Sequence, residues 1–273
     1  MENPNELIEK RIPVPKEFEE VFSHFYLAEN NTANPVARTL LPSYQTILVF
    51  NFGPKASLIS KQNTKIEIDK CVVLGPIKYA FDYILPVGSR ILVVNFKSDG
   101  FYRFFGTALL SDHLPIQPDE LIDDNCFTNL WRLLNRMDPL TEKIAYILEF
   151  SKPYMGNRNA TSELLINFKD DSLNSIKTIA QQTQQSERNI QLTHKKYLGY
   201  SAKEMNRYQR FLKAIELIQN ISSNSAKVDW FEIIDQCGYY DQSQLIHDFR
   251  HFINLSPKTF LKFQQDICQS RAE

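Results

Sequence analysis

The feature that most constrains the fold is an internal repeat in the C-terminal half of the chain. Residues 186–205, SERNIQLTHKKYLGYSAKEM, align without gaps on residues 241–260, DQSQLIHDFRHFINLSPKTF, at a spacing of 55 residues. Each copy opens on a residue whose side-chain oxygen can accept from the free amides of a first helical turn, Ser186 or Asp241. Both copies therefore predict the start of a helix.

Each of these helices has a predicted end and a predicted successor. Gly199 and Asn254 stand at the ends, and both residue types tolerate left-handed backbone geometry. A second N-cap then follows, Ser201 with Glu204 as a capping box in the first copy and Ser256 with Pro257 at the first helical position in the second. The pattern in each copy is a helix, a stop and a new helix.

Apolar and aromatic residues recur at helical spacing behind each cap and are expected to face the core: Ile190, His194 and Tyr197, and Leu245, Phe249 and Phe252. A short apolar helix is expected upstream of each copy, at Ile176, Ile179 and Ala180, and at Phe231, Ile233 and Ile234. This is the order of a helix-turn-helix motif, whose second helix lies in the DNA major groove. Two such motifs are predicted.

With the apolar residues facing the core, one mostly polar face of each helix is expected to be exposed. In the first copy this face carries Glu187, Arg188, Gln191, Leu192 and Lys195, and in the second it carries Gln242, Ser243, Ile246, His247 and Arg250. Gln and Arg suit the edges of adenine and guanine, and Lys and Arg suit phosphates. Between the copies runs an amphipathic stripe of Met205, Tyr208, Phe211, Leu212, Ile215 and Ile218. We interpret it as a strut that sets the recognition helices about one DNA turn, roughly 34 Å, apart.

The N-terminal part has a different character. Residues 44–96 contain short β-branched and aromatic runs separated by turn residues: YQTILVFNF, KIEI, CVVLG, KYAFDYILP and ILVVNF. After Pro118 the period becomes helical, with Leu130, Leu133, Leu134 and Met137, then Leu140, Ile144, Ile147 and Leu148. Two interpretations of these helices remain open, packing on their own β domain or pairing with a second copy of the chain. The stretch SKPYMGNRNA is the best candidate for a linker.

Composition limits the remaining classes. Residues 1–156 carry 16 basic and 19 acidic residues, and residues 157–273 carry 15 and 13, a weakly basic balance that is compatible with DNA contact without indicating it. Four dispersed cysteines, Cys71, Cys126, Cys237 and Cys268, indicate core residues in a reducing compartment. With no membrane-length apolar run and no signal-peptide pattern, we expect a cytoplasmic protein that does not contact a membrane.

Residues 159–265 resemble the DNA-binding domain of the AraC/XylS family of bacterial regulators. SER with YLGYSAKEM, and GYYDQSQL with FRHF and LSPKTF, carry the resemblance. It implies a seven-helix domain with two recognition helices joined by a long helix. It also implies base-facing positions at Arg188, Gln191 and Leu192, and at Gln242, Ser243, Gln244 and His247. Gln244 is in addition a candidate capping partner of Asp241.

This chain departs from the family pattern at several positions. Gln184 and Gln185 occupy a turn where glycine and an apolar residue are usual, and His194 stands where an aromatic core residue is typical. Leu192 and His247 occupy places where arginine is common. Because the second motif follows the pattern more closely than the first, we expect the two halves of the operator to be read with unequal strictness.

The β-rich part resembles the cupin-like N-terminal domain of AraC-type regulators through LLPSYQTILVFNFG, CVVLGP and ILVVNFKSDGFYRFFG. Only His24 and His113 lie in this half, without an HxH pair, so neither a metal, a cofactor nor catalytic residues are expected. Arg38, Tyr44, Gln45, Tyr83 and Arg103 are candidate pocket residues, although structural roles are favoured.

The expected fold is α+β: a cupin-like β-barrel sensor domain at 1–118, amphipathic helices and a linker at 119–156, and an all-α double helix-turn-helix domain at 157–273. The expected function is sequence-specific transcription regulation. The expected partners are double-stranded promoter DNA, RNA polymerase, a small-molecule effector and a second copy of the chain. The competing hypothesis is a cupin-like enzyme or ligand carrier whose C-terminal helices mediate protein contacts.

Overall fold

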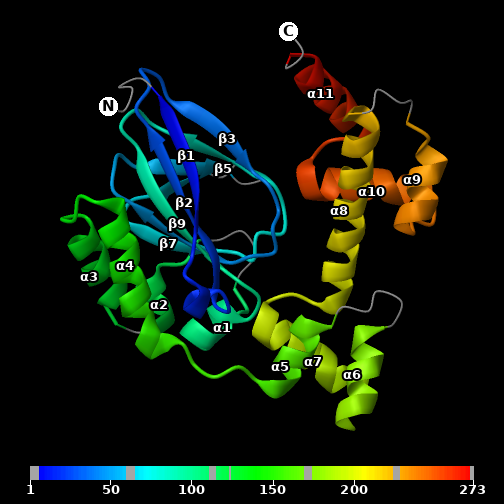
Figure 1. Cartoon of the computed structure of the whole chain (residues 1–273), viewed down its shortest axis with the longest axis horizontal. Coiled ribbons are helices and arrows are strands. Elements are labelled where there is room, and N and C mark those ends of the chain that lie inside the picture. Colours follow the sequence, from blue (N-terminus) through cyan, green and yellow to red (C-terminus); the bar gives the residue numbers. More distant parts are fainter. Residues whose placement is uncertain are drawn as a thin grey trace. The chain divides into compact units, whose positions relative to one another are not determined.

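The computed structural model describes residues 6–59, 65–110, 115–122, 124–168, 174–223 and 228–270. The chain divides into two compact units, residues 1–201 and residues 202–273 (Figure 1). The first unit contains all the described strands and the helices up to α7, and the second unit contains α8 to α11. None of the described helices is long and apolar enough to cross a membrane.

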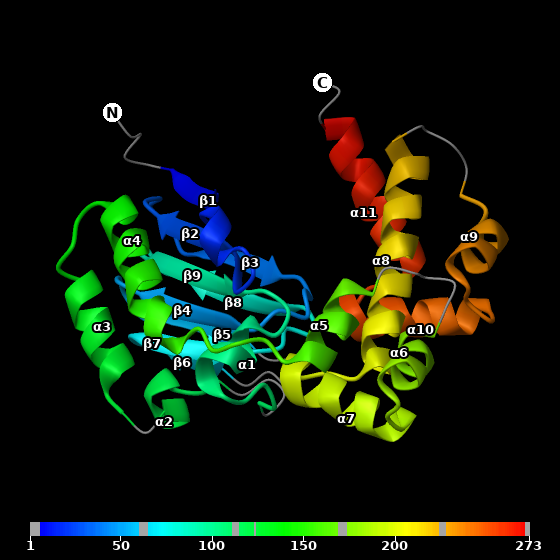
Figure 2. The same ribbon diagram turned by 60° about the horizontal axis from the view of Figure 1, so that its bottom comes forward.

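The strands of the first unit form two antiparallel sheets that face each other (Figure 2). One sheet has the order β1 (Leu7–Pro13), β2 (Phe22–Asn30), β9 (Arg90–Phe96), β4 (Ile47–Asn51), β7 (Cys71–Leu74). The other has the order β3 (Val36–Leu40), β8 (Phe81–Leu85), β5 (Ala56–Ile59), β6 (Lys65–Ile68). The described strands thus form a two-sheet sandwich, and their hydrogen bonds do not close the expected barrel into one ring.

The five-stranded sheet is buried on both faces, and β4 shows why its sequence is apolar throughout. Side chains alternate between the faces of a strand. Leu48 and Phe50 belong to the core on the outer face, whereas Ile47 and Val49 belong to the core between the sheets. An uninterrupted apolar run is therefore required here instead of an alternating one.

Helices cover the outer face of this sheet: α1 (Gly100–Phe105), α2 (Pro118–Ile122), α3 (Cys126–Leu134) and α4 (Leu140–Ser151). The prediction of α3 and α4 is confirmed, and their buried residues share a core with the strands. The Trp131 indole donates to the Asn51 carbonyl at 2.7 Å, which ties α3 to β4. Packing on their own domain is thus observed, and pairing with a second copy stays a prediction.

All five predicted strand segments contain a strand, whereas β1, β2, β3, β5 and the helix α1 were not anticipated. The interpretation of the cysteines holds for Cys71 and Cys237, which are buried and unpaired. Burial raises the pKa of the Cys71 thiol to about 12, so this thiol stays protonated at neutral pH.

Seven helices follow residue 159 in the described ranges, the number that the family resemblance implies. They are α5 (Ala160–Asn167), α6 (Ser175–Thr183), α7 (Glu187–Leu198), α8 (Ala202–Ser223), α9 (Trp230–Cys237), α10 (Gln242–Ile253) and α11 (Pro257–Ser270). In the predicted stripe of α8, Tyr208, Phe211 and Ile218 are buried as expected. The prediction that Leu212 is buried is wrong: it is 43% exposed, and Ala214 is buried instead.

The predicted linker contains a 3-10 helix at Lys152–Tyr154, and polar contacts hold it to α1 and to the N-cap residue of α1. The Arg103 Nε donates to the Gly156 carbonyl at 2.7 Å. The Arg158 Nε lies 3.1 Å from Oδ1 of Asp99, a carboxylate with no exposed surface, and the Ser162 hydroxyl donates to the other oxygen of that carboxylate at 3.1 Å. Helices α5 to α7 therefore belong to the same compact unit as the sheets, and the three-segment domain division stays a prediction.

Replacing Arg158 by Met is expected to lower the free energy of unfolding by about 3 kcal/mol, because it leaves the buried Asp99 carboxylate without its cation. Chemical denaturation monitored by circular dichroism measures the change. The double variant Arg158→Met/Asp99→Asn should recover part of the loss. A single variant as stable as the parent would contradict this role for the pair.

Candidate functional site

The first helix-turn-helix motif consists of α6 and α7. The Ser186 hydroxyl accepts from the Asn189 amide at 3.2 Å at the start of α7, and Gly199 ends the helix with φ 80°. Ile190 and His194 are buried on the inner face, and the His194 Nδ1 donates to the Tyr200 carbonyl at 2.8 Å. The predicted Ser186 cap, the end at Gly199 and the buried positions Ile190 and His194 are confirmed, whereas Tyr197 is half-buried. The capping box of Ser201 with Glu204 stays a prediction.

The turn between α6 and α7 contains a strained residue. Gln184 adopts a left-handed conformation with φ 53°, the geometry that glycine provides in the family pattern. Gln185 accepts from the Asn189 side chain at 2.6 Å and supports the first turn of α7. The turn is thus formed without the usual glycine.

The second motif consists of α9 and α10, and two side-chain bonds cap the start of α10 in a variant of the capping box. The Asp241 carboxylate accepts from the Gln244 amide at 2.8 Å, and the Gln244 side-chain oxygen accepts from the Tyr240 amide at 2.9 Å. Asn254 ends α10 with φ 58°. The buried positions Leu245, Phe249 and Phe252 are confirmed, whereas Phe231 of α9 is 82% exposed instead of buried.

The predicted base-facing residues lie on one helix in each motif. The five on α7 are all exposed: Glu187, Arg188, Gln191, Leu192 and Lys195. On α10, Gln242, Ser243, His247 and Arg250 are exposed, and Gln244 and Ile246 are half-buried. The side-chain oxygen of Gln244 already accepts from the Tyr240 amide, so its side-chain NH2 group is the part that can bond to a base, as a donor. Base contact itself stays a prediction for every one of these residues.

The inner side of α7 packs on the β-sandwich. The rings of Tyr197 and Tyr102, from α7 and α1, have centroids 4.3 Å apart, and Tyr200 meets Tyr44 edge-to-face at 5.1 Å. A Cβ on Gly199 would lie 2.5 Å from the Ala108 carbonyl oxygen, so glycine is required there for close approach as well as for its positive φ. The first recognition helix is thereby held by the N-terminal half of its own unit.

A polar cluster that sequence reasoning missed joins α8 to α10. Asp248 is 1% exposed, and its two oxygens are 2.6 Å from the Arg207 Nε and 3.1 Å from an Arg210 terminal nitrogen. The Arg207 guanidinium also lies 2.9 Å from the His247 Nδ1. Asp248 occupies a core position of α10, where a carboxylate needs cationic partners. The arginines of α8, Arg207 and Arg210, were the sequence signal that could have indicated the cluster.

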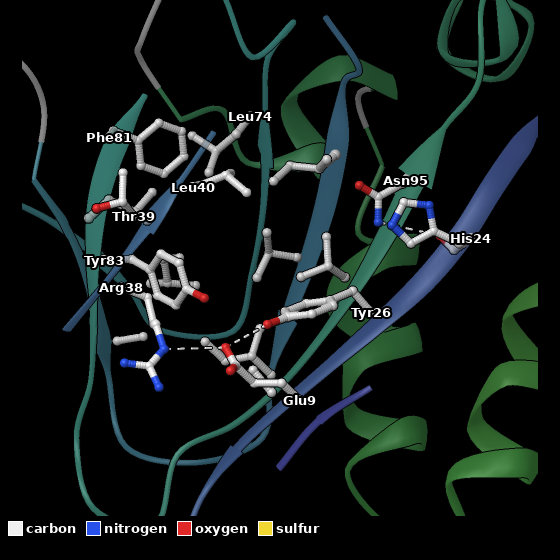
Figure 3. A pocket seen from close by; sticks show the side chains of 18 residues that line it. Glu9, His24, Tyr26, Arg38, Thr39, Leu40, Leu74, Phe81, Tyr83 and Asn95 are labelled. Atoms are coloured by element: carbon white, nitrogen blue, oxygen red, sulfur yellow. Dashed lines mark hydrogen bonds and ion pairs between the residues drawn. The ribbon is translucent and has the colours of Figure 1, made fainter. Parts of the chain in front are cut away.

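A cavity of about 350 Å³ lies between the two sheets (Figure 3). Most of its lining is apolar: Ala28, Leu40, Ile47, Val49, Ala56, Leu58, Ile68, Leu74, Phe81, Ile91 and Val93. Its polar lining consists of Glu9, His24, Tyr26, Arg38, Thr39, Tyr83 and Asn95. Of the candidate pocket residues, Arg38 and Tyr83 line this cavity, and Tyr44, Gln45 and Arg103 do not.

Most polar groups of the cavity gather at one side. The Tyr26 hydroxyl donates to the Glu9 carboxylate at 2.8 Å, and the Arg38 Nε lies 3.6 Å from the same carboxylate (Figure 3). Burial raises the pKa of both Tyr26 and Tyr83, so both phenols remain hydrogen-bond donors. Apart from this group lies His24, whose pKa is lowered by burial and then by Arg11, whereas His113 lies outside the described residues.

Comparison with known proteins gives structural neighbours only. No family model and no curated protein matches the sequence. The structure of ToxT from Vibrio cholerae is 15% identical, covers 85% of this chain and 98% of its own, and has a TM-score of 0.41. The AraC-like transcriptional activator CuxR is 9% identical, with coverages of 98% and 87% and a TM-score of 0.26. A cupin domain from Bordetella pertussis is 10% identical over 36% of this chain and 98% of its own, with a TM-score of 0.26.

These scores are too low to assign the chain to a family or to transfer a function. The chain's own elements nevertheless show the expected fold: a two-sheet β domain followed by helices that contain two capped helix-turn-helix motifs. The α+β class and the order of the parts are therefore those predicted.

Replacing Gln184 by Gly is expected to raise the free energy of unfolding by up to about 1 kcal/mol, because glycine adopts positive φ without the Cβ clash. Gln182→Gly is the matched control, since this neighbouring exposed glutamine lies within α6 and its replacement should cost about 1 kcal/mol. Thermal unfolding of both variants provides the comparison. A destabilised Gln184→Gly variant would contradict the assignment of strain.

Proposed function

We propose that the chain is a sequence-specific DNA-binding transcription regulator that inserts α7 and α10 into the major groove. The observation that supports this most directly is that the two helices repeat one design. Each follows a short helix, opens on a side-chain cap, buries one apolar face and exposes a polar face. A recognition helix needs this combination, because its inner face must be fixed while its outer face remains available to bases.

The exposed faces have suitable chemistry for DNA. Arg188 and Gln191 lie within the first turns of α7, and Gln242 and Ser243 open α10. Arginine pairs with guanine, glutamine pairs with adenine, and serine bonds to either. Lys195 and Arg250 lie further along the same helices, where they suit phosphates. Leu192, 59% exposed, offers an apolar contact for a thymine methyl group.

We expect Arg188→Ala and Gln242→Ala each to weaken binding to the specific site by about 1–3 kcal/mol while leaving non-specific binding unchanged. Specific binding is measured by footprinting and fluorescence anisotropy on the region upstream of the chain's own gene. Non-specific binding is measured in the same way on a scrambled duplex of equal length. Arg136→Ala is the control, because this arginine is exposed just after α3 and belongs to neither motif. An equal loss on both duplexes would argue against base contact.

Absence of any DNA complex at low salt would favour the competing hypothesis, a cupin-like enzyme or carrier with helices that mediate protein contacts. Pairing of two copies and contact with RNA polymerase remain predictions that belong to the regulator hypothesis.

The cavity supports a second part of the proposal, that the sandwich binds a small apolar effector. Its volume of about 350 Å³ lies within the range of ligand pockets, about 300–1,000 Å³. The walls are aliphatic and aromatic, and the Glu9, Tyr26 and Arg38 group can orient one polar end of a ligand. Arg38 lies 3.6 Å from the Glu9 carboxylate and donates to the Ala37 carbonyl at 3.2 Å, which leaves other donors of its guanidinium for an acceptor on the ligand.

Filling the cavity should abolish binding of an apolar dye. Ala56, which is 1% exposed and lines the cavity, is replaced by Trp, and Ala37, exposed on strand β3 of the same sheet, is replaced by Trp as the control. We expect saturable enhancement of 8-anilinonaphthalene-1-sulfonate fluorescence for the parent and for Ala37→Trp, and its loss for Ala56→Trp. Undiminished dye binding by a folded Ala56→Trp variant would remove the cavity as the site.

A further inference from the structure

The side chain of Arg207 is directed entirely to one helix. Its Nε donates to the Asp248 carboxylate at 2.6 Å, and its two terminal nitrogens lie 2.9 Å from the His247 Nδ1 and 3.4 Å from the His251 Nε2. The guanidinium carbon lies 5.4 Å from the centroid of the Phe252 ring. Arg207 is only 28% exposed, so α8 holds it against three polar partners on α10.

This arrangement determines which nitrogen of His247 carries the proton. A guanidinium has five donors and no acceptor, so the His247 Nδ1 must accept and must be unprotonated. In a neutral imidazole the proton is then on Nε2. The His247 side chain is 73% exposed on the outer face of α10, so its Nε2–H is available to a ligand as a donor.

We propose that Arg207 is a positioning residue for DNA recognition: by fixing the ring and tautomer of His247 it makes that side chain a hydrogen-bond donor that selects guanine. The inference rests on the proposed function, because it requires α10 to lie in the major groove. The inference goes beyond the proposed function in two ways. It assigns base recognition to His247, where the usual arginine is absent, and it gives a role to Arg207, which lies outside the recognition helix.

The choice of base follows from the edges of the base pairs. Guanine presents two acceptors in the major groove, O6 and N7, to which a single N–H can donate, whereas adenine presents one acceptor beside a donor and thymine presents one acceptor beside a methyl group. Cytosine presents a donor at N4, which would face the Nε2–H group. A G·C pair opposite the second turn of α10 is therefore favoured over C·G, and the opposite tautomer of His247 would lose this preference.

The test is selection of binding sites from a random duplex pool by the full chain. Four proteins are compared: the parent, His247→Ala, Arg207→Met and Arg210→Met. Arg210 is the matched control, because it is 24% exposed and also binds Asp248, at 3.1 Å, whereas among the described residues it makes no hydrogen bond to His247. Both arginine variants remove one cation from the buried carboxylate, and only one of them releases the imidazole.

We expect the parent to enrich a motif with one guanine whose preference falls about fivefold or more in His247→Ala and in Arg207→Met, and stays in Arg210→Met. The other positions of the motif should remain in all four. Preservation of that guanine in His247→Ala or Arg207→Met, or its equal loss in Arg210→Met, would overturn the inference. Failure of the parent to enrich any motif would instead refute the proposed function.

A second measurement does not depend on a variant that folds. Nitrogen-15 NMR of the parent distinguishes the two imidazole tautomers, and we expect His247 to carry its proton on Nε2. A proton on Nδ1 in the free protein would overturn the assignment without any DNA experiment.

Discussion

The buried carboxylate of Asp99 is the group on which the arrangement of the first unit depends. An ionised carboxylate with no exposed surface is costly unless cations and donors surround it. Arg158 and Ser162 supply them from 59 and 63 residues further along the chain. The segment that leaves α4 must therefore return to α1, and Asn159 then caps α5 at that place. The sandwich and the first helix-turn-helix motif are joined as a consequence.

The second unit uses a comparable solution with a different result. Asp248 is also buried, and two arginines from α8 bind it. There the partners join α8 to α10, and a terminal guanidinium nitrogen of Arg207 also lies 2.9 Å from Nδ1 of the exposed His247. A group that first secures the core thus also orders a side chain on the surface. In the first unit, α7 and the residues after it pack on the domain that encloses the cavity, through the ring contacts of Tyr197 with Tyr102 and of Tyr200 with Tyr44.

The features of this fold that depend on neighbouring residues could be predicted from the sequence, whereas contacts between residues far apart in the sequence could not. Caps such as Ser186 and Asp241 act within one turn, and the structure places their bonds where the repeat predicts them. Strand β3, VARTL, lacks an apolar run because most of it is exposed, which explains why it was missed. Phe231 and Leu212 fit the helical period, yet they are 82% and 43% exposed in the described part of the chain. The pairs Asp99–Arg158 and Arg207–Asp248 connect residues too distant in sequence for any periodicity to reveal.

The same ion pairs bear on the proposed DNA-binding surface of the nearly neutral C-terminal part. Arg158 is committed to Asp99, and Arg207 and Arg210 are directed to Asp248, so these three guanidinium groups are not available to phosphates. Phosphate contact is left to exposed residues such as Lys195, Arg250 and Lys258. Fewer neutralised phosphates mean less counterion release and weaker non-specific affinity. A regulator built in this way must obtain its preference for one site from the geometry of a few base-facing groups, and those groups therefore have to be held rigidly from behind.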